Sequence, residues 1–141
     1  DVIEHDELVA AVPADHALAR RKSVALRELA DQPFIIHSAI SVLHIITILE
    51  CQKAGFAPRV AQEATQVQTI LSLVQSGLGV GLVPARMARF APESVRLMPL
   101  TEPIAIEMGI AYRPDAEPLV RNFVAVAHQQ GDIQSLSKTP K

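Results

Sequence analysis

Three short polar side chains stand where expected strands give way to helices, and they are the residues of this chain best suited to hold a ligand. Ser38 and Ser41 follow the apolar segment 34–37, and Thr65 follows the segment 59–64. The first amides of a helix have no partner within it, and the aligned peptide dipoles add about half a positive charge there. Hydroxyl groups beside such amides offer hydrogen-bond donors without a formal cation. The pattern predicts a site for a small organic anion, with a carboxylate as the best-fitting group.

The rest of such a ligand would contact the apolar side chains beside the hydroxyls, because small-molecule pockets are mostly apolar with a few polar anchors. Helix capping alone is the alternative role for Ser41 and Thr65, although a cap uses only some of the free amides. His37 and Gln66 are weaker candidates, since a satisfied or an exposed polar role also explains them. The residues expected to bind the ligand are Ser38, Ala39, Ile40, Ser41, Leu43, Thr65 and Gln66.

The helix after Thr65 carries signals at both ends. Gln68 stands three residues after Thr65, so a capping box is expected, in which each side chain bonds the backbone amide of the other residue. Gly77 and Gly79 supply the left-handed backbone that ends a helix, and the apolar segment 80–83 is expected to be a strand of a parallel sheet. The inward face of the helix is expected to carry Val67, Ile70, Leu71, Val74 and Leu78.

A third helix start is expected at Pro84, directly after the segment 80–83. Parallel strands deliver their carboxyl ends to one edge of a sheet. The helix starts at Ser41, Thr65 and Pro84 are therefore expected to face one cleft, where their positive ends would act together on an anion.

Other kinds of chemistry find little support in the sequence. The five histidines lack the paired spacing of a zinc site, and the single cysteine, Cys51, reads as a buried inert thiol without a disulfide partner. Ser76 is not a nucleophile elbow, because Val74 stands where a glycine is required. The glycines at 77–81 follow a helix and precede a strand, which is the reverse of the dinucleotide-binding order. We expect no catalytic residues, no metal and no cofactor.

Strands and helices alternate through the middle of the chain. Ser41 is expected to open a helix that runs to about Ala54 and ends at a left-handed Gly55. Its apolar residues cover more than one face, so a sheet cannot bury them all, and either a neighbouring subunit or a loop of the same chain must cover the remainder. These residues are Val42, Leu43, Ile45, Ile46, Ile48 and Leu49.

The remaining segments have weaker signals. A short helix, 24–30, is expected with Ser23 as its cap, and 95–97 is expected to be an edge strand. Extended segments are expected at 8–12 and 104–112. A helix at 117–130 is expected to bury Leu119, Phe123 and Val126, and the polar tail from Gly131 onward is expected to be disordered.

The bulk composition excludes several classes of protein. The 141 residues are 49% hydrophobic and 20% charged, enough material for one core. A net charge of -2 argues against a nucleic-acid surface within this chain, which would need clustered lysine and arginine. No apolar run approaches the roughly 20 residues that span a bilayer, and the first residues lack the features of a signal peptide. We therefore expect a cytoplasmic protein that does not contact a membrane.

Several short motifs, in fixed order over residues 7–127, resemble the effector-binding domain of LysR-type transcriptional regulators. The run LVxxGxGVxLxP is the most distinctive of them, and the PFI strand precedes it. Ala17 departs from the family, which usually has proline there. The matching segments are 8–19, 26–30, 33–35, Gly55 with Phe56, Glu63, 73–84 and 95–100.

The resemblance implies an α/β fold of the periplasmic-binding-protein-like type 2 class, with one complete lobe and the remnant of a second. Residues 1–13 would be a crossover strand and remnant of lobe I, and residues 14–102 would be lobe II. Residues 103–130 would return to lobe I as a strand and helix, and 131–141 would be the disordered tail. Because the chain starts at Asp1 and the family's N-terminal winged helix-turn-helix is missing, we expect a fragment.

The function implied by the resemblance is regulatory and not enzymatic. A small organic anion would bind between two lobes and change how a homodimer or tetramer presents its DNA-binding domains, so DNA would be contacted only through the missing N-terminal domain. Two alternatives stay open. One is a solute-binding protein of a transporter, which has the same fold, and the other is a small α/β enzyme with an unrecognised site.

Overall fold

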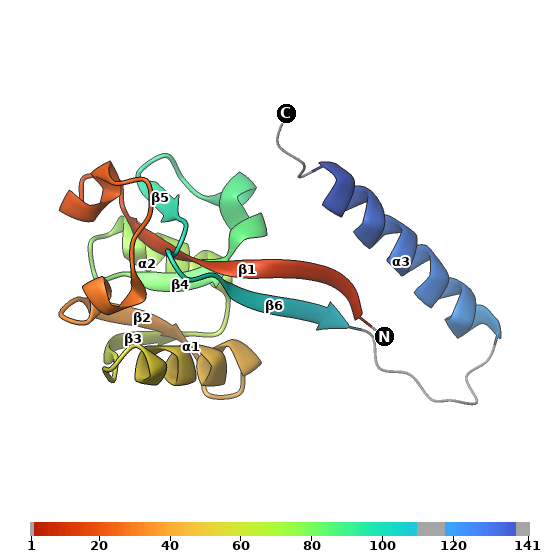
Figure 1. The fold of residues 1–141 in the computed structure, drawn as a ribbon, viewed down its shortest axis with the longest axis horizontal. Coiled ribbons are helices and arrows are strands. Elements are labelled where there is room, and N and C mark those ends of the chain that lie inside the picture. The colour runs from red at the N-terminus through yellow and green to blue at the C-terminus, as the bar shows by residue number, and fades with distance from the viewer. Residues whose placement is uncertain (1, 110–117, 138–141) are drawn as a thin grey trace. The chain divides into compact units, whose positions relative to one another are not determined.

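The structure is a computed structural model that describes residues 2–109 and 118–137 (Figure 1). The chain divides into two compact units, and their described residues are 7–104 in the larger and 2–6, 105–109 and 118–137 in the smaller. None of the described helices is long and apolar enough to cross a membrane. The elements of the larger unit are β1 (Val2–Pro13), η1 (Ala17–Arg20), η2 (Leu26–Leu29), β2 (Pro33–His37), α1 (Val42–Lys53), β3 (Arg59–Ala64), α2 (Val67–Gln75), β4 (Gly81–Pro84), η3 (Ala85–Phe90) and β5 (Val95–Met98), with β1 extending beyond it.

Two strand systems meet at the middle of the larger unit. β2 and β3 pair in parallel, as the alternation of strands and helices predicted. β1 pairs antiparallel with β4 on one side and with the edge strand β5 on the other. A parallel bridge between Phe34 and Val80 joins the two systems. The segment 80–83 was expected to be a strand of a parallel sheet, but only Val80 pairs in parallel. β4 itself pairs antiparallel with the long strand β1, so the expectation is wrong for 81–84.

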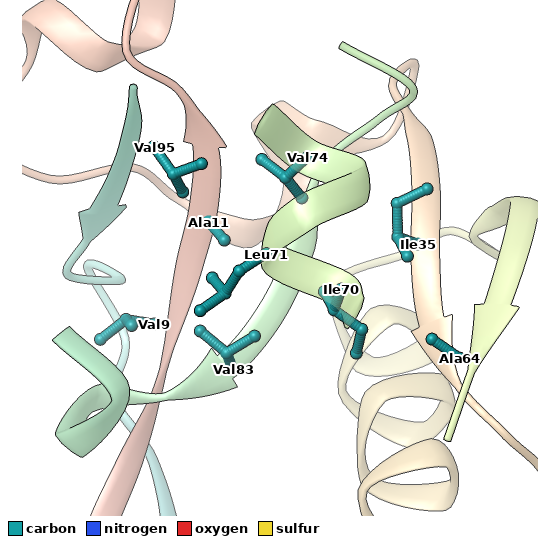
Figure 2. Close-up of a cluster of buried hydrophobic side chains, with 9 residues drawn as sticks. All are labelled: Val9, Ala11, Ile35, Ala64, Ile70, Leu71, Val74, Val83 and Val95. Atoms are coloured by element: carbon teal, nitrogen blue, oxygen red, sulfur yellow. The ribbon is translucent and has the colours of Figure 1, made fainter. Parts of the chain in front are cut away.

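Helix α2 supplies the centre of the hydrophobic core (Figure 2). Ile70, Leu71 and Val74 are almost completely buried and lie between side chains of β1, β2 and β4, as the helical spacing predicted. Fully burying an aliphatic side chain of this size stabilises a fold by about 1.5 to 3 kcal/mol. Leu78 was also expected inward but is about half exposed, because the helix has already ended at Gln75.

The ends of α1 agree with the sequence, but its buried face does not. Ser41 is the N-cap and Gly55 has a φ of 95°. The residues of α1 that are fully buried are Thr47 and Cys51, whose short side chains allow close packing. The apolar stripe at Val42, Ile45 and Leu49 is instead 67%, 55% and 49% exposed. No loop within residues 7–104 buries this stripe, so the covering loop that the sequence left open is not found in the larger unit.

Glycines end α2 and allow a close backbone approach after it. Gly77 has a φ of 80°, which is the left-handed conformation predicted for the helix exit. Gly79 does not share that conformation, so its predicted role is wrong. A Cβ on Gly79 would lie 3.0 Å from the carbonyl carbon of Pro33 and closer still to its oxygen. Gly79 is thus needed where the chain passes against β2.

One shorter element differs from the sequence expectations. The helix expected at 24–30 is only the 3-10 helix η2, with Ala25 in place of Ser23 as its N-cap. The Glu28 carboxylate accepts a hydrogen bond from the Ala25 amide at 2.8 Å and pairs with Arg21. Val24 is not helical, because it bridges to Leu100.

The smaller unit contains β6 (Ile104–Gly109), which continues from the larger unit and pairs with β1, and α3 (Pro118–Ser137). α3 runs on through Gly131, so a disordered tail is not what the structure has over 131–137, and residues 138–141 lie outside the described chain. Residues 110–112 of the expected strand also lie outside it. Leu119, Phe123 and Val126, which were expected to be buried, are 78%, 65% and 55% exposed.

Candidate functional site

The ends of β2 and β3 bring the predicted ligand residues to one edge of the sheet. His37 and Ala64 are the last residues of these strands and are register partners. The Ser38 amide donates to the carbonyl oxygen of Ala64 at 2.9 Å, which extends the pairing one residue further. The two turns that follow, 38–41 and 65–66, therefore leave the same edge. We call the residues Ser38, Ala39, Ile40, Ser41, Leu43, Thr65 and Gln66 the strand-end site.

Ser38 has an unsatisfied hydroxyl group. Its Oγ is shielded from solvent and has no hydrogen-bond partner among the described residues. Leaving a buried hydroxyl unpaired costs about 1 to 3 kcal/mol. Such a cost at a strand end suggests a group that is satisfied only when another molecule is present.

The start of α1 is rigidly built. The Ser41 amide donates to the Ser38 carbonyl oxygen at 2.9 Å, and Ser41 Oγ accepts from the Leu43 amide at 3.2 Å. His44, in the first turn, donates from Nδ1 to the His37 carbonyl oxygen at 2.7 Å. Since a carbonyl oxygen only accepts, Nδ1 must carry the hydrogen. The turn between β2 and α1 is thus held by both backbone and side-chain bonds.

His37 joins β2 to β4 and does not reach out to a ligand. Its side chain is buried, and Nε2 donates to the carbonyl oxygen of Leu82 at 3.2 Å. Burial lowers the pKa of His37, the Leu82 carbonyl opposes that shift, and the nearby His44 adds to it. His37 therefore stays neutral at pH 7 and supports the site from behind. The satisfied polar role that the sequence left open for His37 is the one the structure has. The role of His44 was missed, because its partner is a carbonyl group that the fold brings near.

The start of α2 lacks the predicted capping box. Gln66 is the N-cap, with no side-chain hydrogen bond to the helix amides, so Thr65 lies one residue too early to cap. Thr65 and Gln66 are both exposed. The capping alternative for Thr65 is therefore not what the structure has, and no side chain caps the first amides of α2.

The apolar residues of the strand-end site differ in exposure, and the third expected helix start, at Pro84, opens only a short helix. Ile40 is 92% exposed, Ala39 is exposed and Leu43 is half-buried. The residues after Pro84 form η3, a 3-10 helix of six residues with no side-chain cap. Such a short element contributes little dipole, so the electrostatic pull on an anion comes from α1 and α2.

No strongly nucleophilic or metal-binding group stands out in the described chain. Among described residues, no three His, Cys, Asp or Glu side chains gather to hold a metal ion. Burial first, and the Glu50 carboxylate second, raise the pKa of Cys51 to about 11, so its thiol stays protonated at neutral pH. The strand-end site includes no lysine or arginine, which leaves backbone amides and hydroxyls as its donors.

Comparisons of this chain with family models, curated proteins and solved structures all point to the same family. The LysR substrate binding domain matches residues 2–132 of this chain. The HTH-type transcriptional regulator YwbI of Bacillus subtilis is 40% identical over 115 residues, which cover 80% of this chain but only 38% of that protein. The chain thus spans about two-fifths of the length of this curated relative.

Solved structures agree with the family match. HinK, a LysR family transcriptional regulator from Pseudomonas aeruginosa, aligns with a TM-score of 0.78 at 20% identity, over 93% of this chain and 48% of that chain. The effector-binding domain of BenM, solved with its effector benzoate, aligns with a TM-score of 0.74 at 23% identity, over 99% of this chain and 65% of that chain. These identities show the fold alone, which is the α/β, periplasmic-binding-protein-like fold predicted from the sequence.

Proposed function

Since this chain belongs to the LysR-type transcriptional regulators, as the substrate-binding domain of that family, we propose that it senses a small organic anion at the strand-end site. The ligand carboxylate accepts hydrogen bonds from the free amides at the starts of α1 and α2 and from the hydroxyls of Ser38 and Thr65. Ala39, Ile40 and Leu43 contact the apolar body. Residues 14–102 act as lobe II, and residues 1–13 and 103–130 belong to lobe I.

The observation that carries this proposal is the buried, unpaired Oγ of Ser38. It lies at the end of β2, in the turn that leads to the Ser41 cap, and its backbone is fixed to the end of β3. A ligand oxygen that reaches it removes the cost of an unsatisfied hydroxyl. The benzoate bound by the BenM domain is an anion of the proposed class, which supports the same chemistry here.

Regulation follows from unequal binding to two lobe arrangements. A ligand shifts such an equilibrium only by its difference in affinity for the two states, typically about 1 to 3 kcal/mol. The shift is passed to DNA through an N-terminal helix-turn-helix domain in the longer protein, in the cytoplasm. The regulator class of YwbI and HinK favours this reading over a transport protein or an enzyme.

The exposed stripe Val42, Ile45 and Leu49 on α1 supports a subunit contact. An apolar stripe of a helix is seldom left in water unless another surface covers it. A second copy of the regulator is the partner that fits the proposed homodimer or tetramer, because α1 packs on β2 with one face and leaves this stripe exposed.

The ligand proposal is tested by NMR titration of the ¹⁵N-labelled chain with benzoate and with benzamide, its uncharged isostere. We expect benzoate to shift the amide signals of 38–43 and 65–68, and benzamide to shift them at least about fivefold more weakly, since amides near helix starts favour the charged group. The double variant S38A/T65A, which removes both proposed hydroxyl donors, should lose most of the benzoate response. A panel of carboxylates that leaves all these signals unmoved would overturn the proposal.

A further inference from the structure

The carboxyl end of α1 borders a cavity that is not part of the strand-end site. It has a volume of about 330 Å³ and lies entirely within the unit 7–104. Its walls come from the start of η2, the last turn of α1 and the segment that leads into β6. We call this cavity the α1-end pocket, and its chief lining residues are Leu26, Arg27, Glu50, Ala54, Glu102 and Ile104.

The charges of the α1-end pocket are of both signs, and two of the charged side chains, Arg27 and Glu102, form no ion pair in the described chain. Lys53, which also lines it, pairs with Glu50 at 3.2 Å. The side chains of Arg27 and Glu102 make no hydrogen bond or ion pair within the described part of the chain, although the Arg27 charge acts through space on Glu28. Glu28, the acidic neighbour of Arg27, is bound instead by Arg21 and the Ala25 amide. A guanidinium and a carboxylate thus line one small cavity while both remain available.

The backbone adds to this polarity. α1 ends at Lys53, so the negative end of its dipole lies at the pocket wall near Ala54 and favours a cation there. Apolar contact is also present, because Ile104 is buried and Leu26 and Ala54 are half-buried. The cavity therefore offers a guanidinium that can bind a carboxylate, a carboxylate that can bind an ammonium group, and a short apolar surface. Its volume is within the size range of small-ligand pockets.

We propose that the α1-end pocket binds a zwitterionic amino acid with an aliphatic side chain. Arg27 takes the carboxylate, Glu102 and the carboxyl end of α1 take the ammonium, and Leu26, Ala54 and Ile104 contact the side chain. This site would be separate from the strand-end site, since Ser41 and Ala54 flank opposite ends of a 12-residue helix, a length of about 18 Å.

The position of the pocket gives such a ligand a route to regulation. It contacts the helix whose other end forms the strand-end site, and it contacts Ile104, the first residue of β6. A molecule bound there changes the restraint on both elements. The affinity of either site for its ligand would then depend on occupation of the other, by the same factor in both directions.

The test is an NMR titration of the ¹⁵N-labelled chain with L-leucine and with two molecules that each lack one charge, 4-methylpentanoate and 3-methylbutylamine. We expect leucine to shift the signals of 25–27, 53–54 and 101–104 in a saturable way. Each half-molecule should bind about threefold to tenfold more weakly, as expected for loss of one partly exposed ion pair. The assay separates this proposal from the proposed function, because signals at 38–43 report the strand-end site.

Matched variants decide whether the charges act as proposed. R27Q and E102Q should each weaken leucine binding, whereas R20Q and E93Q, which remove exposed charges outside the pocket, should not. The proposal is overturned if leucine moves no signal of the pocket up to about 100-fold excess. It is equally overturned if the half-molecules bind as well as leucine, or if all four variants behave alike.

Discussion

The Nδ1 atom of His44 lies 2.7 Å from the carbonyl oxygen of His37, so a side chain in the first turn of α1 closes on the last residue of β2. This bond spans the turn that contains Ser38 and Ser41. It fixes the angle at which α1 leaves the sheet, and with it the direction of the free amides of the helix. The geometry of the candidate site therefore depends on a residue that need not touch a ligand.

Replacing His44 by alanine should destabilise the chain by about 0.5 to 1.5 kcal/mol, which is the usual net value of one hydrogen bond. Urea denaturation measures the change. His5→Ala is a suitable control, because the His5 side chain is largely exposed at its contact with Glu107. Equal stability of H44A and the parent chain would show that the bond does not hold the turn.

Ser38→Ala should have opposite effects on stability and on binding. Because the Oγ of Ser38 is buried without a partner, removing it should leave the free energy of unfolding unchanged or raise it by up to about 1 kcal/mol. Ligand affinity should fall by about fivefold or more, as measured by the benzoate titration. A loss of stability without a loss of affinity would assign Ser38 a purely structural role.

Gly79→Ala should be among the most damaging single changes in the chain. The added Cβ would collide with backbone atoms of Pro33, which cannot move without breaking the pairing of β2. We expect a loss of more than about 2 kcal/mol or failure to fold. Gly77→Asn serves as the comparison in thermal melting, since Gly77 has open space around it and asparagine tolerates a positive φ at a cost of about 1 kcal/mol.

His37 should make stability depend on pH. Because burial lowers its pKa in the folded state below the usual 6.5, the unfolded chain binds its proton first as pH falls. Its contribution is complete above about pH 6.5 and is lost progressively below it. The unfolding free energy of His37→Gln should therefore change less than that of the parent chain between pH 7 and pH 5, whereas parallel curves would contradict this assignment.

Ile45→Glu should disrupt self-association, because it places a charge in the middle of the exposed stripe on α1. Light scattering coupled to gel filtration should report a smaller species, with benzoate binding retained. Gln68→Glu, at an exposed position of α2, should keep the parent mass. If I45E also keeps it, α1 is not the subunit contact.

Some features that depend on near neighbours in the sequence were predictable, although the capping box expected at Thr65 was not among them. Ser41 and Gly55 mark the ends of α1 because a cap and a left-handed exit are local backbone events. The inward face of α2 followed from spacing, since Ile70, Leu71 and Val74 repeat with the helix period. The family resemblance added the fold class, which short motifs in fixed order indicate better than any one of them.

Only the tertiary structure decided which surfaces are covered and which polar groups are satisfied. The periodicity of α1 locates its apolar residues but not the sheet, so the burial of Thr47 and Cys51 and the exposure of Ile45 could not be read from it. The partner of His37 is Leu82, 45 positions away, and the missing partner of Ser38 is likewise a property of packing. Local sequence determined both ends of α1, whereas burial and hydrogen-bond satisfaction depend on distant segments that only folding brings together.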